Sequence, residues 1–246
     1  MPRQTPKSSR RRTGPGRPEG VSLTREHILN AAEKVFAELG YAGTSLREIV
    51  DRAHVTKALA NYYFGNKEKL FEEIFLRRAL PIVEERMAAL AALKREKGDT
   101  VTLRELVEIY LAPLLRMPRV APAKNFMQIH ARLHMEPQDF ALTLRRNVYN
   151  ESTRAYAEAI SKVLPHLSLR TVYWRLILMV GANLYAISGT HRIEEISKGL
   201  CDPNDFDEVV QHVTDFVCAG LEAPASAQSA GKRISPPRAA RARASG

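Results

Sequence analysis

The chain has 246 residues, enough for one large or two small domains, and a formal net charge of +10. It has no apolar run of membrane-spanning length, and its first residues lack the apolar segment of a signal peptide. Cys201 and Cys218 lack zinc-site spacing and give no reason to expect a disulfide. We therefore expect a cytoplasmic protein without a membrane partner.

The excess positive charge lies in the two end segments of the chain. Residues 1–20 carry six basic side chains and one acidic one, and residues 222–246 carry five and one, so these segments contribute +5 and +4. Both are rich in Arg together with Pro, Ser, Gly or Ala, a composition with little that can form a packed core. We predict a disordered basic arm at 1–20 and a disordered basic tail at 222–246.

Residues 44–64 predict two short helices joined by a tight turn. Ser45 and Glu48 have the spacing of a capping box at the start of the first helix. Thr56 is placed to cap the second helix, and Gly65 to end it. Two helices joined in this way are typical of the helix-turn-helix, whose second helix enters the major groove of DNA.

The second helix has an inward and an outward face, because successive residues turn by about 100°. Ala60 and Phe64 point inward, and the opposite face carries side chains suited to DNA. One alternative is that residues 62–64 form an aromatic core, which we accept for Phe64 alone. The candidate DNA-binding residues of the two helices and their ends are Ser45, Arg47, Thr56, Lys57, Ala58, Leu59, Asn61, Tyr62, Tyr63 and Lys67.

Their chemistry assigns different roles to these candidates. Asn61 can pair bidentately with adenine, Lys57 can reach guanine, and Ala58 or Leu59 can contact a thymine methyl group. The remaining hydroxyls and cations near the helix ends are suited to phosphates: Thr56, Tyr62, Arg47 and Lys67.

Residues 24–70 resemble the N-terminal domain of the TetR family of transcriptional regulators. The resemblance rests on residues 28–32 (ILNAA), 36–41 (FAELGY), 44–49 (TSLREI) and 62–70 (YYFGNKEKL). His54 departs from the family pattern, which usually has a turn glycine there, so a positive φ at this residue would be strained. Asn61 stands where an aromatic residue is common. The run at 60–65 (ANYYFG) is similar to a subgroup that includes fatty-acid-responsive regulators.

The basic arm precedes the first helix of this domain directly. It contains three consecutive arginines at 10–12 and then Gly16, Arg17 and Pro18, which resemble the core of a minor-groove A·T hook. Extended basic arms beside helix-turn-helix domains can enter the adjacent minor groove. Arg17 is therefore a candidate minor-groove residue, with loose phosphate contact as the alternative.

The rest of the chain predicts helices only, since apolar residues recur at intervals of three and four. We expect an all-α fold: an N-terminal three-helix helix-turn-helix DNA-binding domain at 21–66 and a C-terminal helical domain at 67–221. Pro81 is expected to kink or divide the first helix of the C-terminal domain. The expected helices of that domain are 67–93, 103–116, 124–134, 138–164, 169–188 and 206–221, with connections at 94–100, 117–123 and 190–204.

The helix expected at 169–188 is apolar almost all round, which indicates burial from several sides. A homodimer would supply the second side, and the family resemblance implies a four-helix bundle across a twofold axis. Such a dimer predicts a pseudo-palindromic operator in double-stranded DNA. The alternative is that this helix is the core of a monomer.

The resemblance also implies that the C-terminal domain dimerises and holds an effector pocket. Trp174, Tyr149 and Asn183 are the preferred candidates to face a cavity, because their tips are polar. The subgroup resemblance implies a small apolar effector, a fatty acid or an acyl-CoA. The candidate pocket residues, for each of which core packing is the alternative, are Tyr110, Leu114, Phe126, Met127, His130, Tyr149, Trp174, Leu178 and Asn183.

Three functions stay open at this point: a ligand-gated repressor, an architectural DNA-binding protein driven by its basic tails, and a metalloenzyme with a DNA-binding domain. The last reading rests on His130 and His134, four residues apart as in helical zinc sites, followed by Glu136. However, there is no His-Glu-x-x-His motif, and Pro137 directly follows Glu136. We find no phosphate-binding glycine loop or nucleophile motif, and we predict a non-enzymatic protein without metal or cofactor.

Overall fold

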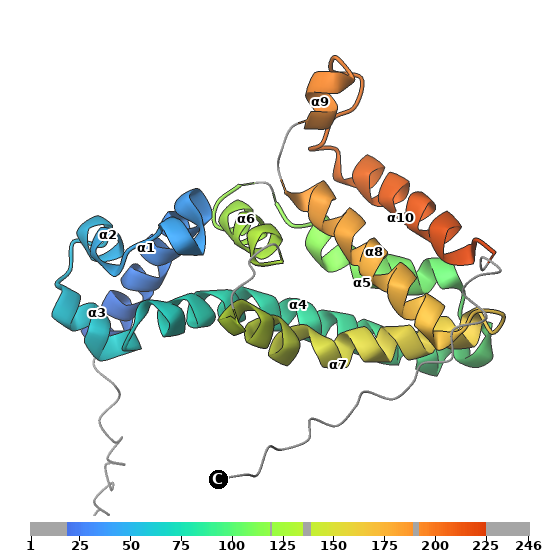
Figure 1. Cartoon of the computed structure of the whole chain (residues 1–246), viewed down its shortest axis with the longest axis horizontal. Helices are drawn as coiled ribbons and strands as arrows, with labels where there is room; N and C mark the ends of the chain where they lie inside the picture. The colour runs from blue at the N-terminus through green and yellow to red at the C-terminus, as the bar shows by residue number, and fades with distance from the viewer. Residues whose placement is uncertain (1–18, 119, 135–138, 189–191, 225–246) are drawn as a thin grey trace, which may run out of the picture. The chain divides into compact units, whose positions relative to one another are not determined.

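In the computed structural model, which describes residues 19–118, 120–134, 139–188 and 192–224, the chain is helical (Figure 1). No strand occurs among the described residues, which confirms the all-α class. The predicted basic segments, apart from Glu19, Gly20 and 222–224, lie outside the described residues. The elements are α1 (Glu19–Gly43), α2 (Leu46–Arg52), α3 (Lys57–Phe64), α4 (Lys67–Lys97), the 3-10 turn η1 (Gly98–Thr100), α5 (Leu103–Leu115), α6 (Ala123–Leu133), α7 (Asp139–Val163), α8 (Leu169–Ile187), α9 (Arg192–Ile196) and α10 (Phe206–Glu222).

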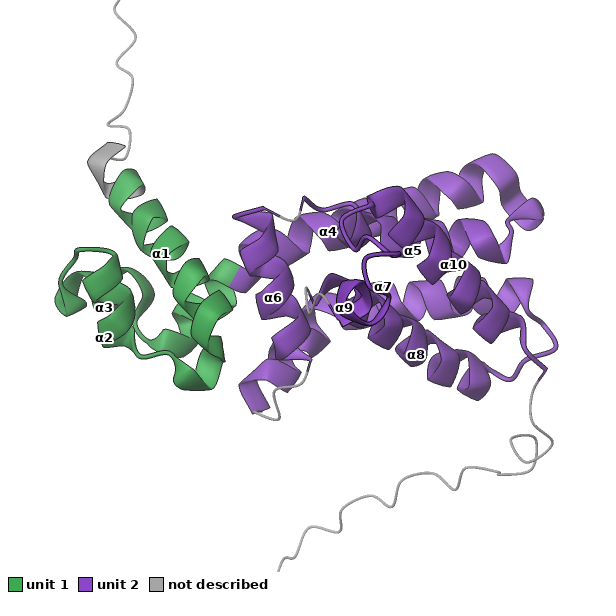
Figure 2. Ribbon diagram, turned by 90° about the horizontal axis from the view of Figure 1, so that it is seen from above, with its two compact units in different colours: residues 1–74 green, residues 75–246 purple. Residues whose placement is uncertain are grey.

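The chain divides into two compact units, residues 1–74 (unit 1) and residues 75–246 (unit 2) (Figure 2). The division falls inside α4, whereas the sequence places the boundary between residues 66 and 67. Phe71 of α4 explains this difference, because its ring packs edge-on against Phe36 at 5.0 Å and against Tyr41 at 5.2 Å. The first turns of α4 therefore complete the core of unit 1.

Local sequence signals set the ends of the helices in unit 1. Gly40 interrupts α1 with φ 71°, a left-handed conformation that glycine adopts without strain. Ser45 caps α2 by accepting a hydrogen bond from Glu48 N at 3.1 Å. The Glu48 carboxylate lies 3.6 Å from Arg52. Apolar residues from all four helices fill the core of this unit: Ile28, Leu29, Ala32, Val35, Phe36, Ile49, Val50, Ala60, Phe64, Leu70, Phe71 and Ile74.

Unit 2 is a helical bundle with its own apolar core. Within it α10 packs against α5 and α8, α7 packs against α5 and α8, and α6 packs against α8. Burial of each large apolar side chain contributes about 1.5–3 kcal/mol, so this core is the main source of stability for the unit. Its buried residues include Leu106, Val107, Leu111, Tyr156, Ile160, Val172, Leu176, Val217 and Leu221.

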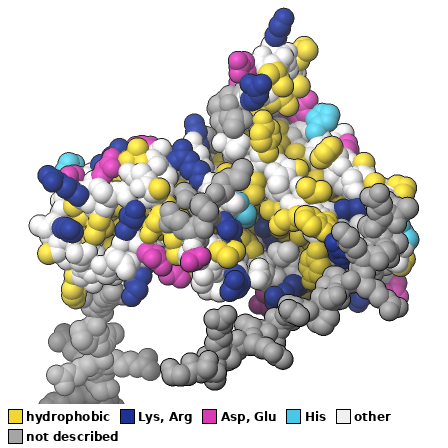
Figure 3. Space-filling view, viewed as in Figure 1, with side chains coloured by type: hydrophobic (Ala, Val, Ile, Leu, Met, Phe, Trp, Pro, Cys, Tyr) yellow, Lys and Arg dark blue, Asp and Glu magenta, His cyan; other side chains and the backbone are white. Residues whose placement is uncertain are grey.

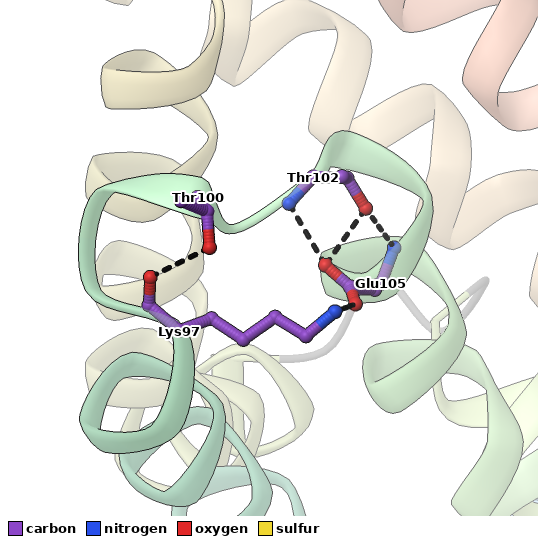
Figure 4. A network of polar contacts seen from close by, with 4 residues as sticks. All are labelled: Lys97, Thr100, Thr102 and Glu105. Atoms are coloured by element: carbon purple, nitrogen blue, oxygen red, sulfur yellow. Dashed lines mark hydrogen bonds and ion pairs between the residues drawn. The ribbon is translucent and has the colours of Figure 1, made fainter.

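A polar network fixes the start of α5 (Figure 4). Thr102 Oγ1 accepts from Glu105 N at 3.3 Å, and the Glu105 carboxylate accepts from Thr102 N at 2.9 Å, which completes a capping box. Lys97 forms an ion pair with the same carboxylate. The hydrogen bond from Lys97, followed by those from Thr102, lowers the pKa of Glu105 to about 2. Thr100 Oγ1 donates to the Lys97 carbonyl at 2.8 Å, so the end of α4 and the start of α5 are tied together.

The structure bears on two details of the predicted helices. Pro81 does not divide α4, which continues to Lys97. A proline inside a helix removes one backbone hydrogen bond and crowds the preceding turn, at a cost of about 3 kcal/mol. Burial of the α4 side chains Ile74, Phe75 and Ile82 offsets this cost. The segment 190–204, expected to be a connection, contains α9. None of the helices described has both the length and the apolarity of a membrane span.

Candidate nucleic-acid interface and cavities of unit 2

The turn before α3 and the ends of α3 follow the sequence signals. Thr56 Oγ1 accepts a hydrogen bond from Leu59 N at 3.2 Å, which caps the helix. Gly65 ends it with φ 75°, and its N–H donates to the Asn61 carbonyl at 2.8 Å. His54 in the turn has φ 50°, the left-handed region in which a side chain is strained. The helix-turn-helix geometry predicted for residues 44–64 is therefore present.

The two faces of α3 differ sharply in exposure. Ala60 and Phe64 are buried, and the Arg25 guanidinium lies 5.3 Å from the centre of the Phe64 ring. On the other side Ala58 and Asn61 are exposed, and Tyr62 has 80% of its surface open to solvent. Hence the outward face points where the helical period places it. Lys57 and Thr56 at the helix start are also exposed, whereas Leu59 and Tyr63 are half-buried.

Around α3, the other candidates of unit 1 have varied surroundings. Ser45 and Arg47 are exposed at the start of α2, and Arg47 lies 3.8 Å from Asp51 in a solvent-exposed pair. An open groove, lined by residues of α1 and α2, places Lys34 near Arg47. Lys34 is a further candidate for phosphate contact that sequence patterns do not identify, because only the fold brings α1 beside α2. Arg17 lies outside the described residues.

Lys67 has a contact that the sequence does not predict. Its ammonium group donates to the carbonyls of Tyr41 at 3.0 Å and Thr44 at 2.9 Å, and lies 4.2 Å from the centre of the Tyr41 ring. These contacts tie the start of α4 to the link between α1 and α2. The side chain therefore holds the framework of unit 1, which differs from the expected role of an open phosphate ligand.

Five of the nine candidate pocket residues line one cavity of about 250 Å³ in unit 2. They come from α5, α6, α7 and α8, and the cavity also receives Arg86 of α4. The guanidinium of Arg86 was not among the sequence candidates, because nothing in the helical pattern separates it from the surface arginines of α4. The five predicted residues are Tyr110, Leu114, His130, Tyr149 and Asn183.

His130 lies at the centre of an aromatic cluster beside this cavity. Its ring is parallel to the Phe75 ring at 5.9 Å and perpendicular to the Tyr149 ring at 5.5 Å. Burial, together with the nearby His134 and Arg86, holds the pKa of His130 well below its ordinary value. Burial also raises the pKa of Tyr149. Both groups are therefore neutral near pH 7.

Trp174 and Leu178 line neither this cavity nor the larger cleft of unit 2. α8 buries Val172, Leu176, Met179, Asn183 and Ile187 on one face, which leaves Trp174 and Leu178 on the opposite face with 61% and 68% of their surface exposed. A polar tip therefore does not distinguish a cavity-facing tryptophan from a surface one. Apolar side chains are visible at the surface over α8 and α10 (Figure 3). The exposed apolar stripe comprises Tyr173, Trp174, Ile177, Leu178 and Tyr185 of α8 and Phe216 of α10.

The remaining two candidates lie in different surroundings. Phe126 is buried, with its ring 5.7 Å from the Phe75 ring and 5.6 Å from the His130 ring. Met127 lines a larger and mainly apolar cleft of about 650 Å³, formed by residues of α6, α8, α9 and α10 and the chain between the last two. Unit 2 thus offers a small cavity with several buried polar groups in its lining and a larger, mainly apolar cleft.

The histidine pair at the end of α6 has no metal-site geometry in the described part of the chain. His134 Nδ1–H donates to the His130 carbonyl at 3.0 Å, so this ring nitrogen is already occupied. Among the described residues no three His, Cys, Asp or Glu side chains cluster as a metal site requires. Glu136 lies outside those residues.

A helix-turn-helix in unit 1 and a separate helical bundle in unit 2 define the class of two-domain, helix-turn-helix DNA-binding regulators. A family model described as "Bacterial regulatory proteins, tetR family" matches residues 28–74. A second model, described as "Tetracyclin repressor-like, C-terminal domain", matches residues 108–220. The chain belongs to the TetR family of bacterial transcriptional regulators.

Individual relatives agree with this assignment. The transcriptional repressor NicS of Pseudomonas putida is 33% identical over 125 residues, which cover 50% of this chain and 57% of NicS. The transcriptional regulator RutR of Escherichia coli is 33% identical over 95 residues, covering 39% and 43%. The chain thus spans about half the length of these curated relatives. A solved TetR-like regulator from Rhodococcus sp. RHA1 shares the fold over 86% of this chain and 98% of its own, with a TM-score of 0.58 and 20% identity.

Proposed function

We propose that this protein is a transcriptional repressor that binds double-stranded DNA as a homodimer and is released by a small-molecule effector. The observation that carries the proposal is the outward face of α3, where Asn61 and Tyr62 are exposed opposite the buried Ala60 and Phe64. A helix whose other face is anchored in a core presents such side chains rigidly to a groove. The role is regulatory rather than catalytic, and it belongs to the cytoplasm, where bacterial DNA lies.

The exposed groups of α3 suit both base reading and phosphate binding. Asn61 has the amide that pairs with adenine, and Lys57 lies at the end of the helix that reaches base edges. Ala58 is positioned for a thymine methyl group, while Tyr62 and Thr56 offer hydroxyls to phosphates. Arg47 can turn to a phosphate, because an exposed pair with Asp51 at 3.8 Å holds it only weakly. The contribution of Arg17 stays a prediction.

The proposed dimer uses the exposed apolar stripe of α8 and α10. Monomeric proteins rarely expose a contiguous apolar surface of this kind. The same stripe on a second copy is self-complementary across a twofold axis, and α8 and α10 already pack together in one chain. A twofold dimer places its two α3 helices on half-sites about one DNA turn apart, or a multiple of it, which predicts an inverted repeat.

The effector part of the proposal rests on family membership and on the two spaces in unit 2. An effector releases DNA only if it binds the released arrangement of the dimer more tightly than the DNA-bound one. A fatty acid or acyl-CoA, which the resemblance of residues 60–65 implies, stays a prediction. The apolar cleft of about 650 Å³ beside Met127 is the space of unit 2 suited to an acyl chain.

Selection of genomic DNA fragments by the purified protein tests this function. The experiment is done at about 0.15 M salt, because nonspecific binding through basic tails weakens steeply as salt rises. A repressor of this kind enriches one inverted repeat. Enrichment of A·T-rich DNA without a repeat would instead identify an architectural protein whose tails dominate, and would refute the proposed function.

A further inference from the structure

Arg86 is a buried cation without an acidic partner in the described structure. Only 2% of its surface is exposed. Its Nε donates to the Tyr110 carbonyl at 2.7 Å, and its guanidinium lies 4.1 Å from the centre of the Tyr110 ring. The Nη2 atom is buried and has no hydrogen-bond partner. A buried charge is unfavourable unless it is paired, so this guanidinium is suited to an anion that none of the described residues supplies.

Three further buried polar atoms around the same cavity lack a partner. They are Tyr149 Oη from α7, His130 Nδ1 from α6 and Asn183 Oδ1 from α8. His130 and Asn183 are only 3% and 2% exposed, and all three residues line the cavity with Arg86. Buried polar groups in native proteins are nearly always satisfied, so four orphaned atoms around one cavity indicate a polar guest.

The lining of the cavity is cationic. Besides Arg86 it includes Arg145, which donates to the Leu133 carbonyl, and the exposed Arg146. No Asp or Glu is among the described residues that line it. Within a low-dielectric interior this arrangement favours a negative guest over a neutral one. A carboxylate matches a guanidinium with parallel hydrogen bonds.

We infer that this cavity binds a small organic acid, whose carboxylate pairs with Arg86 and whose other polar atoms meet Asn183 and Tyr149. The volume of about 250 Å³ lies below the roughly 300–1,000 Å³ of pockets for drug-sized ligands. A short or single-ring acid fits this space, whereas a long acyl chain does not. That this acid is the effector rests on the proposed function; its binding to unit 2 does not.

A thermal unfolding series with the full chain tests the binding step. The probes are lactate, 3-hydroxybutyrate and 4-hydroxybenzoate, each compared with its uncharged amide, with inorganic phosphate as the general anion. A ligand that binds only the folded chain raises Tm by an amount that grows with its concentration relative to its Kd. We expect at least one short acid to raise Tm above its own amide, and phosphate to have no comparable effect.

The Arg86→Met variant separates ligand binding from a structural role. It should bind the effective acid about 10- to 100-fold more weakly, because a charge-assisted hydrogen bond is lost. Without ligand its Tm should equal or exceed that of the wild type, since an unpaired buried charge has been removed. Tyr149→Phe, which removes one hydroxyl, should weaken binding by about 2- to 10-fold. Arg154→Met, at an exposed position of α7, is the matched control and should bind normally.

Three results would overturn the inference. The first is that no short acid raises Tm more than its amide or more than phosphate. The second is that Arg86→Met binds the acid as the wild type does. The third is a large fall in the Tm of unliganded Arg86→Met, which would make the guanidinium structural. DNA selection is performed without the acid. A missing inverted repeat would therefore refute the proposed function, but it would not bear on whether the cavity binds the acid.

Discussion

The outward face of α3 and the cavity around Arg86 hold their polar groups in opposite ways. On α3 the amide of Asn61 and the hydroxyl of Tyr62 are in water, so they need no partner until DNA arrives. Around the cavity the polar atoms of Arg86 and Asn183 are buried without partners. The first site is therefore compatible with a stable folded chain by itself, whereas the second carries an unfavourable desolvation term that a ligand can relieve.

This difference teaches how each site is found. An exposed recognition face appears as the complement of a buried face, and the helical period locates it. A buried site appears only as a failure to satisfy hydrogen bonds, which requires the fold. The two sites should accordingly respond differently to substitution. Changes on the outward face of α3 should alter DNA discrimination without lowering stability. Changes around the Arg86 cavity should alter ligand binding and the pH dependence of stability.

The largest expected effect on stability comes from a comparison of one substitution on each face of α3. Phe64→Ala removes a 5% exposed ring from the core of unit 1 and should lower the free energy of unfolding by about 3–5 kcal/mol. Tyr62→Ala removes a ring that is 80% exposed and should change it by only about 0.5 kcal/mol. Chemical denaturation of both variants measures the difference. Equal losses would place Tyr62 in the core and contradict the orientation of α3.

A smaller expected effect is a pH dependence of the unfolding free energy that arises from His130 beside the Arg86 cavity. Burial holds the pKa of His130 well below its ordinary value of about 6.5, so the unfolded chain takes up a proton before the folded chain does. This part of the stability is complete above about pH 6.5 and is lost as the pH falls toward the lower pKa of the folded state.

Denaturation at about pH 7.5 and about pH 5.5 checks this expectation. The wild type should be less stable at the lower pH. His130→Leu should lose less unfolding free energy between the two conditions, because it lacks the imidazole that takes up a proton on unfolding. His134, whose pKa burial also lowers, should keep part of the dependence in that variant. An identical loss in wild type and variant would show that His130 does not titrate as proposed.

The smallest expected effect concerns the turn that aims α3. His54 has φ 50°, which costs an L-residue about 1 kcal/mol and costs glycine nothing. His54→Gly should therefore raise the free energy of unfolding by up to about 1 kcal/mol, while His54→Ala, which keeps the strained conformation, should not. A fall in stability with glycine would mean that the imidazole makes a stabilising contact that outweighs the strain.

The sequence predicts the helices well and the buried site poorly, for physical reasons. Periodic apolar residues and capping signals such as Thr56 and Gly65 are local, so the ends of α2 and α3 follow from them. The helix α9 is only five residues long and has no buried residue, so it leaves no periodic apolar pattern. Pro81 is the opposite example: the local sequence predicts a kink or a break at this residue, but α4 is not divided there because its buried side chains stabilise the continuous helix.

The candidate cavity was partly predictable, because polar-tipped residues such as Tyr149 and Asn183 on apolar helices indicate a cavity or a core. Trp174, which the same rule selects, is instead exposed on α8, because an exposed apolar helix face has the same local composition as a cavity wall. Arg86 could not be identified at all, because one arginine among several on α4 is distinguished only by what packs around it.

The most direct measurement is the ratio of affinities for the selected inverted repeat and for shuffled DNA, determined by competition at about 0.15 M salt. If α3 reads bases, Asn61→Ala should lower this ratio about tenfold or more while leaving affinity for shuffled DNA nearly unchanged. Tyr62→Ala, which removes a phosphate contact, should instead weaken binding to both DNAs and leave the ratio nearly unchanged. Glu72→Gln, at an exposed position of α4, should keep the wild-type ratio. A ratio unchanged in Asn61→Ala would contradict sequence recognition by the outward face of α3.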